Sequence, residues 1–308
     1  MCRGNADTPL DGGRPSSAPP VYTRERNRGR RPFFHFSNIS LRAARGSSRP
    51  DPDRVRRTPT FDADPWMIAG AIRRPPEAVA QWGRALPKGQ AIVVYCAHGR
   101  EISRDTAASL HGVGLDARFL EGGIGEWSER KLPLRRKRED SPCWVTRERP
   151  KIDRIACPWL IRRFIDPEAS FLFVPTEQVF DVARASGATA YDIPGSEPFS
   201  HNGELCSFDA FLKVYGIADP ALDALALIVR GADTARLELA PQSPGLLAVS
   251  LGLSAIYADD HAMLEHGMTV YDALYAWCRD CRDQGHDWNP AAMATPAGSK
   301  IRRSTRSR

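Results

Sequence analysis

The chain has 308 residues, of which 42% are hydrophobic and 26% are charged, and it carries a formal net charge of +6. This length has room for two ordinary domains, each with its own core. No apolar run approaches the about 18 residues of a membrane-spanning helix, and the N-terminus lacks the apolar core of a signal peptide, so we expect no membrane partner.

The basic charge lies at the two ends of the chain. Residues 1–60 contain 13 Arg against 5 acidic residues, and residues 300–308 contain 5 basic residues and no acidic one. The remaining 25 basic and 32 acidic residues make the segment 61–299 mildly acidic. Basic ends either bind nucleic acid or an acidic membrane surface, or are simply solvated. The acidic middle segment argues against nucleic-acid binding by the folded part.

Seven cysteines occur at irregular spacing. An odd number without a regular pattern is typical of free thiols in a reducing compartment rather than of a disulfide framework. We therefore expect a cytoplasmic protein.

The first 58 residues are rich in Pro, Arg, Gly and Ser and show no periodicity, so we expect disorder over 1–58. Periodic segments then alternate, with a helix predicted at 78–82 and strands at 90–95 and 117–120. This alternation favours an α/β domain over 59–134, in which a parallel sheet is flanked by helices. Its N-terminal strand is expected to be missing, because Arg- and Pro-rich sequence cannot form a buried strand.

Cys96 follows directly on the predicted strand 90–95 and precedes a helical pattern. A thiol at such a junction lies near loop amides and a helix N-terminus, whose partial positive charge favours the thiolate. Arg100 acts in the same direction. We interpret Cys96 as a nucleophile and the following residues as the loop that surrounds its sulfur: Ala97, His98, Gly99, Glu101, Ile102 and Ser103. The alternative is an inert buried cysteine at a strand end.

After a charged linker at 135–143, the second region extends over 144–288 and is followed by a basic tail, 289–308, expected to be disordered. Its pattern predicts a mainly helical α+β domain. Strands are predicted at 143–145, 171–174 and 190–193, and helices at 155–165, 207–215, 221–230, 244–257, 258–266 and 269–283.

The segment 59–134 resembles a rhodanese-type sulfurtransferase domain. The resemblance depends on the following residues: Val94-Tyr95-Cys96, Gly99, Ser103, Ala107-Ala108, Gly114, Leu120-Glu121-Gly122-Gly123 and Trp127. It implies that the Cys96 thiolate takes a sulfane sulfur from a small-molecule donor, holds it as a persulfide and passes it to a thiol or another acceptor. No cofactor is required for such transfer.

The resemblance has one departure in the loop. Ser103, which we expect to open the helix, stands seven residues after Cys96, whereas six is usual in single-domain rhodaneses. The longer loop predicts room for a tetrahedral oxyanion. Phosphatase activity is disfavoured, because phosphatases of this fold need Arg where this chain has Ile102.

From Trp144 onward the chain resembles the C-terminal domain of the chromate-resistance protein family (ChrB-type). The resemblance depends on the following segments: 144–147, 151–156, 159–167, 192–194, 200–201, 206–208, 229–233 and 260–261. It implies a role in chromate resistance, with chromate as substrate, ligand or signal. One alternative is a cytoplasmic chromate-sensing regulator of efflux without catalytic turnover. In another, the first domain is no longer able to fold and the second carries all function.

Two sets of residues in the second region could bind ligands. Arg154, Arg162 and Arg163 lie around one helix and suit a divalent oxyanion, or else they form salt bridges that fix the helix. A metal ion is the second ligand considered, because imidazole, thiolate and carboxylate are metal ligands. Its candidate ligands are His201, Cys206, Asp260 and His261. The alternative is a hydrogen-bonded loop histidine and a helix-capping aspartate.

Overall fold

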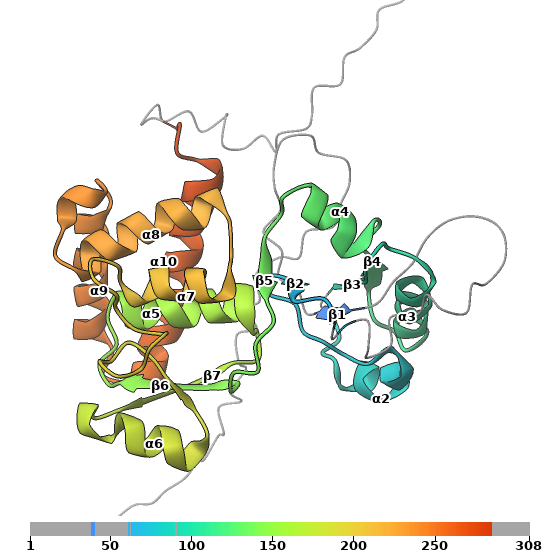
Figure 1. The fold of residues 1–308 in the computed structure, drawn as a ribbon, viewed down its shortest axis with the longest axis horizontal. Helices are drawn as coiled ribbons and strands as arrows, with labels where there is room; N and C mark the ends of the chain where they lie inside the picture. Colours follow the sequence, from blue (N-terminus) through green and yellow to red (C-terminus); the bar gives the residue numbers. More distant parts are fainter. Residues whose placement is uncertain (1–37, 41–60, 62, 90, 285–308) are drawn as a thin grey trace, which may run out of the picture.

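The computed structural model describes residues 38–40, 61, 63–89 and 91–284. Two lobes follow one another along the chain (Figure 1). The first contains a small parallel sheet with helices, and the second is mainly helical with its own three-stranded sheet. This arrangement confirms the predicted fold class. In the described part of the chain, no helix has the length and apolar character needed to cross a membrane.

The sheet of the first lobe has the strand order β1-β3-β4, and all its pairs are parallel. Its central strand β3 (Ile92–Tyr95) lies between β1 (Asn38–Ser40) and β4 (Ala117–Phe119). The expectation that the N-terminal strand of this sheet is missing is therefore wrong, because Asn38–Ser40 form a parallel pair with β3. The three residues Asn38–Ser40 contain neither Arg nor Pro, so the composition of the surrounding sequence does not prevent them from pairing. The rest of the predicted disordered segment lies outside the described residues.

Helix α3 (Glu101–Gly112) covers one face of this sheet, and the short helix α4 (Gly123–Glu129) follows β4. Leu110 of α3 is fully buried against Ile92 and Val94 of β3. Such burial contributes about 1.5–3 kcal/mol for each large aliphatic side chain. The remaining short elements are α2 (Val79–Trp82), β2 (Trp66–Ile68) and β5 (Leu134–Arg136).

Strand β5 pairs antiparallel with β2. The predicted linker 135–143 thus begins inside a strand. Its first charged residues, Arg135 and Arg136, belong to the two-stranded ribbon of β2 and β5. The linker is also anchored further on, where Tyr215 Oη donates to Asp140 Oδ2 at 2.7 Å. The two lobes contact each other directly as well: the Gly70 amide donates to the Phe164 carbonyl at 2.6 Å.

The second lobe contains a parallel sheet of strand order β7-β6-β8. The strands are β6 (Cys143–Arg147), β7 (Ser170–Val174) and β8 (Thr189–Ala190). Alternate residues of β6 point to opposite faces, as expected for a strand. Trp144 packs into the main helical core, whereas Val145 packs with Val179 of α6 (Val179–Ser186). Figure 1 shows α6 on one side of this sheet and the other helices on the opposite side.

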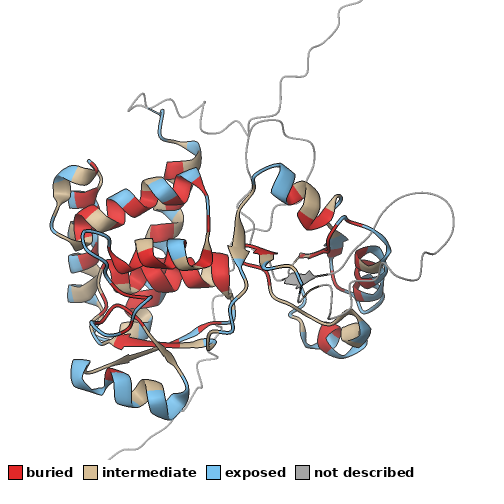
Figure 2. Cartoon of the chain, viewed as in Figure 1, coloured by how far each residue is buried: buried red, intermediate tan, exposed pale blue. Residues whose placement is uncertain are grey.

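The helices on that side are α5 (Asp153–Leu160), extended by a π-helical turn at Ile161–Ile165, and α7 (Ser207–Tyr215), α8 (Pro220–Asp233), α9 (Ser243–Ile256) and α10 (Asp260–Asp280). They enclose the largest buried core of the described residues (Figure 2). Helix α10 is continuous, although two helices were predicted with a break near Gly267. This glycine lies against Ile155 of α5, where a Cβ would approach the Ile155 Cγ2 to 2.6 Å, so it allows close helix packing rather than ending the helix.

Candidate functional site

Cys96 follows the last residue of β3, as the sequence predicts, and is 2% exposed. The segment 96–100, named here the Cys96 loop, connects β3 to α3. Gly99 has a φ of +64°, a conformation that favours glycine. The loop thus turns sharply enough to bring its backbone between a strand end and a helix N-terminus, where partial positive charge accumulates.

The N-terminal residues of α4 form backbone hydrogen bonds with the Cys96 loop. The Ile124 amide donates to the Cys96 carbonyl at 2.6 Å, and the Gly125 amide donates to the Ala97 carbonyl at 2.7 Å. Gly123, with a φ of +58°, is so close that a Cβ there would lie 2.6 Å from the Gly99 nitrogen. These contacts fix the conformation of the Cys96 loop without using the thiol.

Helix α3 begins at Glu101, two residues before the predicted start at Ser103. An acidic residue in the first turn stabilises a helix through its dipole, which favours this earlier start. Glu101, Ile102 and Ser103 therefore belong to the first helical turn and not to the loop. The Ser103 hydroxyl is buried and has no hydrogen-bond partner among the described residues.

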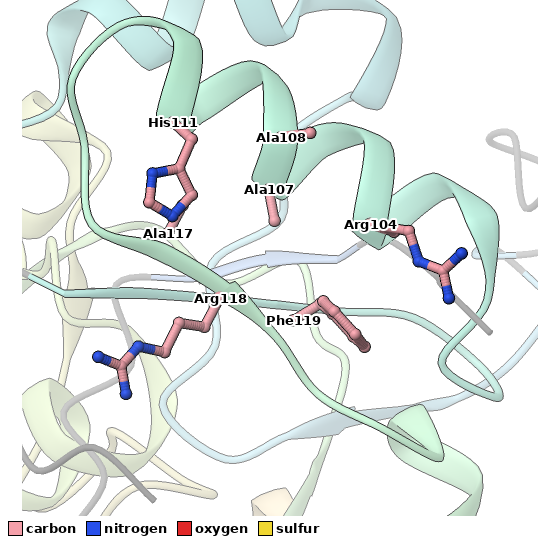
Figure 3. Close-up of a pocket in the computed structure, with 7 residues that line it drawn as sticks. All are labelled: Arg104, Ala107, Ala108, His111, Ala117, Arg118 and Phe119. Carbon is pink, nitrogen blue, oxygen red and sulfur yellow. The ribbon is translucent and has the colours of Figure 1, made fainter. Parts of the chain in front are cut away.

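His98 and Arg100 are the exposed side chains of the Cys96 loop. Figure 3 shows a separate hollow between α3 and β4, with a cavity volume of about 360 Å³. It is lined by Arg104, Ala107, Ala108, His111, Ala117, Arg118 and Phe119. No residue of the Cys96 loop lines this hollow.

A second group of polar side chains lies in the helical lobe and is named here the Asp153 cluster. Its four members come from the start of α5, the segment after β8, the loop before α7 and the end of α8: Asp153, Asp192, His201 and Asp233. Asp153 and Asp192 are buried, with side-chain exposures of 1% and 4%, whereas the His201 side chain is 42% exposed. The cluster is therefore reached from solvent through the histidine.

Asp153 lies at the N-terminus of α7. Its Oδ2 accepts a hydrogen bond from the Ser207 amide at 2.7 Å, and its Oδ1 accepts from the Phe208 amide at 3.0 Å. Cys157 Sγ donates to the same Oδ1 at 3.0 Å. Burial, together with the charges of Asp192 and Asp233, nevertheless raises the pKa of Asp153 well above its usual range. A cation nearby would offset this cost.

Asp192 is the carboxylate of the cluster that contacts two arginine side chains. Arg147 Nη2 lies 3.0 Å from its Oδ2, Arg154 Nε lies 3.4 Å from the same oxygen, and Ser207 Oγ donates to its Oδ1 at 2.8 Å. Burial alone would raise the pKa of Asp192, but hydrogen bonds from His201 and Ser207 and the charge of Arg147 lower it below its ordinary value. Asp192 is therefore ionised at neutral pH.

His201 Nε2 lies among three carboxylate oxygens. It is 3.2 Å from Asp233 Oδ2, 3.3 Å from Asp192 Oδ1 and 3.6 Å from Asp153 Oδ2. Hydrogen bonds to Asp192 and Asp233 raise the pKa of His201 to about 10. Within the described residues, Asp153, Asp192 and His201 form the group of side chains that could hold a metal ion.

The other predicted metal ligands have contacts of their own and do not belong to the group that could hold a metal ion. Cys206 is buried and donates from Sγ to Asp209 Oδ2 at 3.4 Å. Asp260 accepts from the Arg149 amide at 3.0 Å, and His261 packs edge-on against Phe173 with ring centroids 5.4 Å apart. Cys206 therefore caps α7, Asp260 fixes the backbone at Arg149, and His261 packs against an aromatic ring.

The three predicted oxyanion-binding arginines do not converge. Arg154 contacts Asp192 of the Asp153 cluster. Arg162 lies 2.6 Å from Glu265 of α10, and Arg163 forms two hydrogen bonds with Asp272, at 2.9 and 2.8 Å. Arg162 and Arg163 therefore fix the helix to α10, which was the alternative interpretation of this set.

Sequence reasoning missed the three carboxylates that surround His201, as well as the contacts that Arg147 and Ser207 make with Asp192. No spacing rule could have found them, because the members of the cluster are 39, 9 and 32 residues apart along the chain. Only His201 was selected, on its residue type.

Comparisons with known proteins agree with the two lobes. Residues 55–130 match the model of the rhodanese-like domain, which is also the class defined by the parallel sheet and the Cys96 loop. Residues 144–278 match the model of the ChrB C-terminal domain. The chain therefore combines a rhodanese-like domain with a ChrB C-terminal domain, and both predicted resemblances are confirmed.

Protein ChrB from Cupriavidus metallidurans is 36% identical to this chain over 134 residues. The match covers 43% of this chain and 39% of the length of that protein. Two crystal structures of proteins from Lactobacillus plantarum align at 22% and 21% identity, with TM-scores of 0.25 and 0.26. They cover 32% and 33% of this chain, and the alignments span 72% and 74% of those proteins.

Proposed function

We propose that this protein is a sulfurtransferase linked to chromate resistance, with Cys96 as the sulfur carrier. The observation that carries the proposal is the position of Cys96 between the end of β3 and the N-terminus of α3. This position favours the thiolate, which is the nucleophilic form of cysteine. Burial of the sulfur also suits a carrier, because it shields a bound persulfide from competing reactions.

The proposed reaction has two steps. With thiosulfate as donor, the Cys96 thiolate attacks the sulfane sulfur, the S–S bond of the donor breaks, and sulfite leaves with the electron pair. An acceptor nucleophile then attacks the outer sulfur of the persulfide, and the Cys96 thiolate is restored. Backbone amides of the Cys96 loop and of the first turn of α3 would stabilise the negative charge, and Arg100 would contribute its charge from the exposed side.

The link to chromate comes from the second domain. This domain matches the ChrB C-terminal model, and the resemblance to the chromate-resistance family gives the expected biological role. We place the handling of the ligand in the second lobe, since its buried polar cluster lies apart from the Cys96 loop. Sulfur transfer would then supply reduced sulfur to a chromate-exposed cell.

The test is thiosulfate-to-cyanide sulfur transfer by the purified full-length chain, compared with Cys96→Ser and Cys143→Ser. Cys143 is also free and partly exposed, so its replacement is the matched control. Activity that is lost in Cys96→Ser and retained in Cys143→Ser supports the proposal. Absence of transfer by the wild type, together with chromate binding, would refute it and favour a chromate-sensing regulator.

A further inference from the structure

The Asp153 cluster brings three carboxylate oxygens around one imidazole nitrogen. A histidine Nε2 carries at most one hydrogen, which can be directed at one carboxylate or shared between two. Three carboxylate oxygens nevertheless lie within 3.6 Å of His201 Nε2. An imidazolium therefore accounts for two of these contacts at most, while the Ser207 amide and hydroxyl hold Asp153 Oδ2 and Asp192 Oδ1 beside the imidazole.

The spacing of these atoms suits a shared ion. Bonds of about 2.1 Å from Zn²⁺ to nitrogen and oxygen place ligand atoms of a tetrahedral site about 3.4 Å apart. The separations of 3.2, 3.3 and 3.6 Å from His201 Nε2 are close to that value. The ligand atoms of Asp153, Asp192 and His201 all lie within 4.8 Å of one another.

We propose that Asp153, Asp192 and His201 bind one divalent transition-metal ion, next to which Asp233 lies 3.2 Å from His201 Nε2. One imidazole and several carboxylates favour Mn²⁺, Fe²⁺ or Zn²⁺ over Ca²⁺ and over soft monovalent ions. The cluster contains no thiolate ligand, because Cys157 donates its hydrogen to Asp153. The exposed edge of His201 gives the ion its path from solvent.

The surrounding residues hold the carboxylates in place. Ser207 contacts two of them, through its amide to Asp153 and through its hydroxyl to Asp192. Arg147 and Arg154 occupy the second oxygen of Asp192, so the Oδ1 that faces His201 remains directed into the cluster. Hydrogen bonds of this kind orient ligands in metal sites.

The same charges disfavour an oxyanion. A chromate ion at His201 would meet three carboxylates at close range, and the two nearby guanidiniums are already engaged with Asp192. The inference therefore deepens the proposed function by making the ligand of the second domain a cation. It rests on the part of that function which assigns a ligand to this domain, and it does not depend on sulfur transfer at Cys96.

The experiment uses the full-length chain, stripped of metal with a chelator and titrated with Mn²⁺ alone. Electron paramagnetic resonance measures free Mn²⁺. The wild type is expected to bind one Mn²⁺ per chain, and His201→Ala and Asp233→Asn are expected to weaken binding by about tenfold or more. His261→Ala is the matched control, because His261 is an exposed histidine of the same domain outside the cluster. Cys96→Ser should bind as the wild type does, which separates this test from that of sulfur transfer.

Two results would overturn the proposal. One is the absence of saturable binding by the wild type at about 1 mM Mn²⁺, a concentration that detects even weak sites. The other is equal binding by the wild type and His201→Ala. A second readout guards against a folding defect: the same Mn²⁺ concentration should raise the unfolding temperature of the wild type and of His261→Ala by more than that of Asp233→Asn. Equal shifts in all three proteins would also contradict the site.

Discussion

Replacing Gly123 by alanine tests how the Cys96 loop is held. The new Cβ would lie 2.6 Å from the Gly99 nitrogen and 2.8 Å from the Ala97 carbonyl carbon, and it would also overlap the Cys96 carbonyl oxygen. All three are backbone atoms, so no side chain can rotate away. The loop must therefore move, and its hydrogen bonds from Ile124 and Gly125 must lengthen or break.

The magnitude has two parts. An alanine at a φ of +58° costs about 1–2 kcal/mol by itself. Loss of the two backbone hydrogen bonds to the Cys96 loop adds about 0.5–1.5 kcal/mol each. We therefore expect Gly123→Ala to lower the free energy of unfolding by about 2–5 kcal/mol.

Gly114→Ala provides the matched control. Gly114 has a φ of +82°, and a Cβ there would meet nothing within 4 Å, so this variant carries the backbone strain without the collision. Denaturant unfolding measures stability, and mass spectrometry after iodoacetamide treatment measures the alkylation rate of Cys96. Gly123→Ala should be the less stable variant and should change the alkylation rate, whereas Gly114→Ala should leave that rate unchanged. Equal effects of the two variants on both measurements would refute the steric argument.

Three further predictions concern the second domain. Asp153→Ala leaves two buried amides at the start of α7 without an acceptor and should lower the free energy of unfolding by about 2–5 kcal/mol, measured by denaturant titration; a loss below the cost of an ordinary surface change would contradict this. In Arg163→Lys the side chain cannot form both hydrogen bonds to Asp272, so the free energy of unfolding should fall by about 1–2 kcal/mol. Arg162→Lys, at the exposed Glu265, should lower it by less. Thermal unfolding compares the two variants, and the reverse order would be inconsistent with the ion-pair geometry. Burial raises the pKa of Cys278 to about 11, so its alkylation should be slow at neutral pH and increase up to that pH, and a plateau near pH 9 would rule out the shift.

Local features of the fold could be predicted from the sequence. The helix predicted at 207–215 matches α7, and the bounds of α9 differ by one residue at each end, because their apolar periodicity and start signals lie within the helix itself. The predictions were wrong where contacts with another element determine the secondary structure. Two helices were predicted at 258–266 and 269–283, but Gly267 packs against Ile155 within one continuous α10, and β1 is stabilised by pairing with β3 rather than by its own three residues.

The two sites differ in the same way. The sequence by itself determined the position of Cys96, since strand, thiol and helix follow one another directly and their order fixes the electrostatics of the sulfur. Only the tertiary structure decided which residues accompany His201. The carboxylates around it come from α5, the segment after β8 and the end of α8, which are far apart in the chain and meet only in the packed domain. Local order therefore predicted the nucleophile, whereas the candidate metal ligands are brought together by packing.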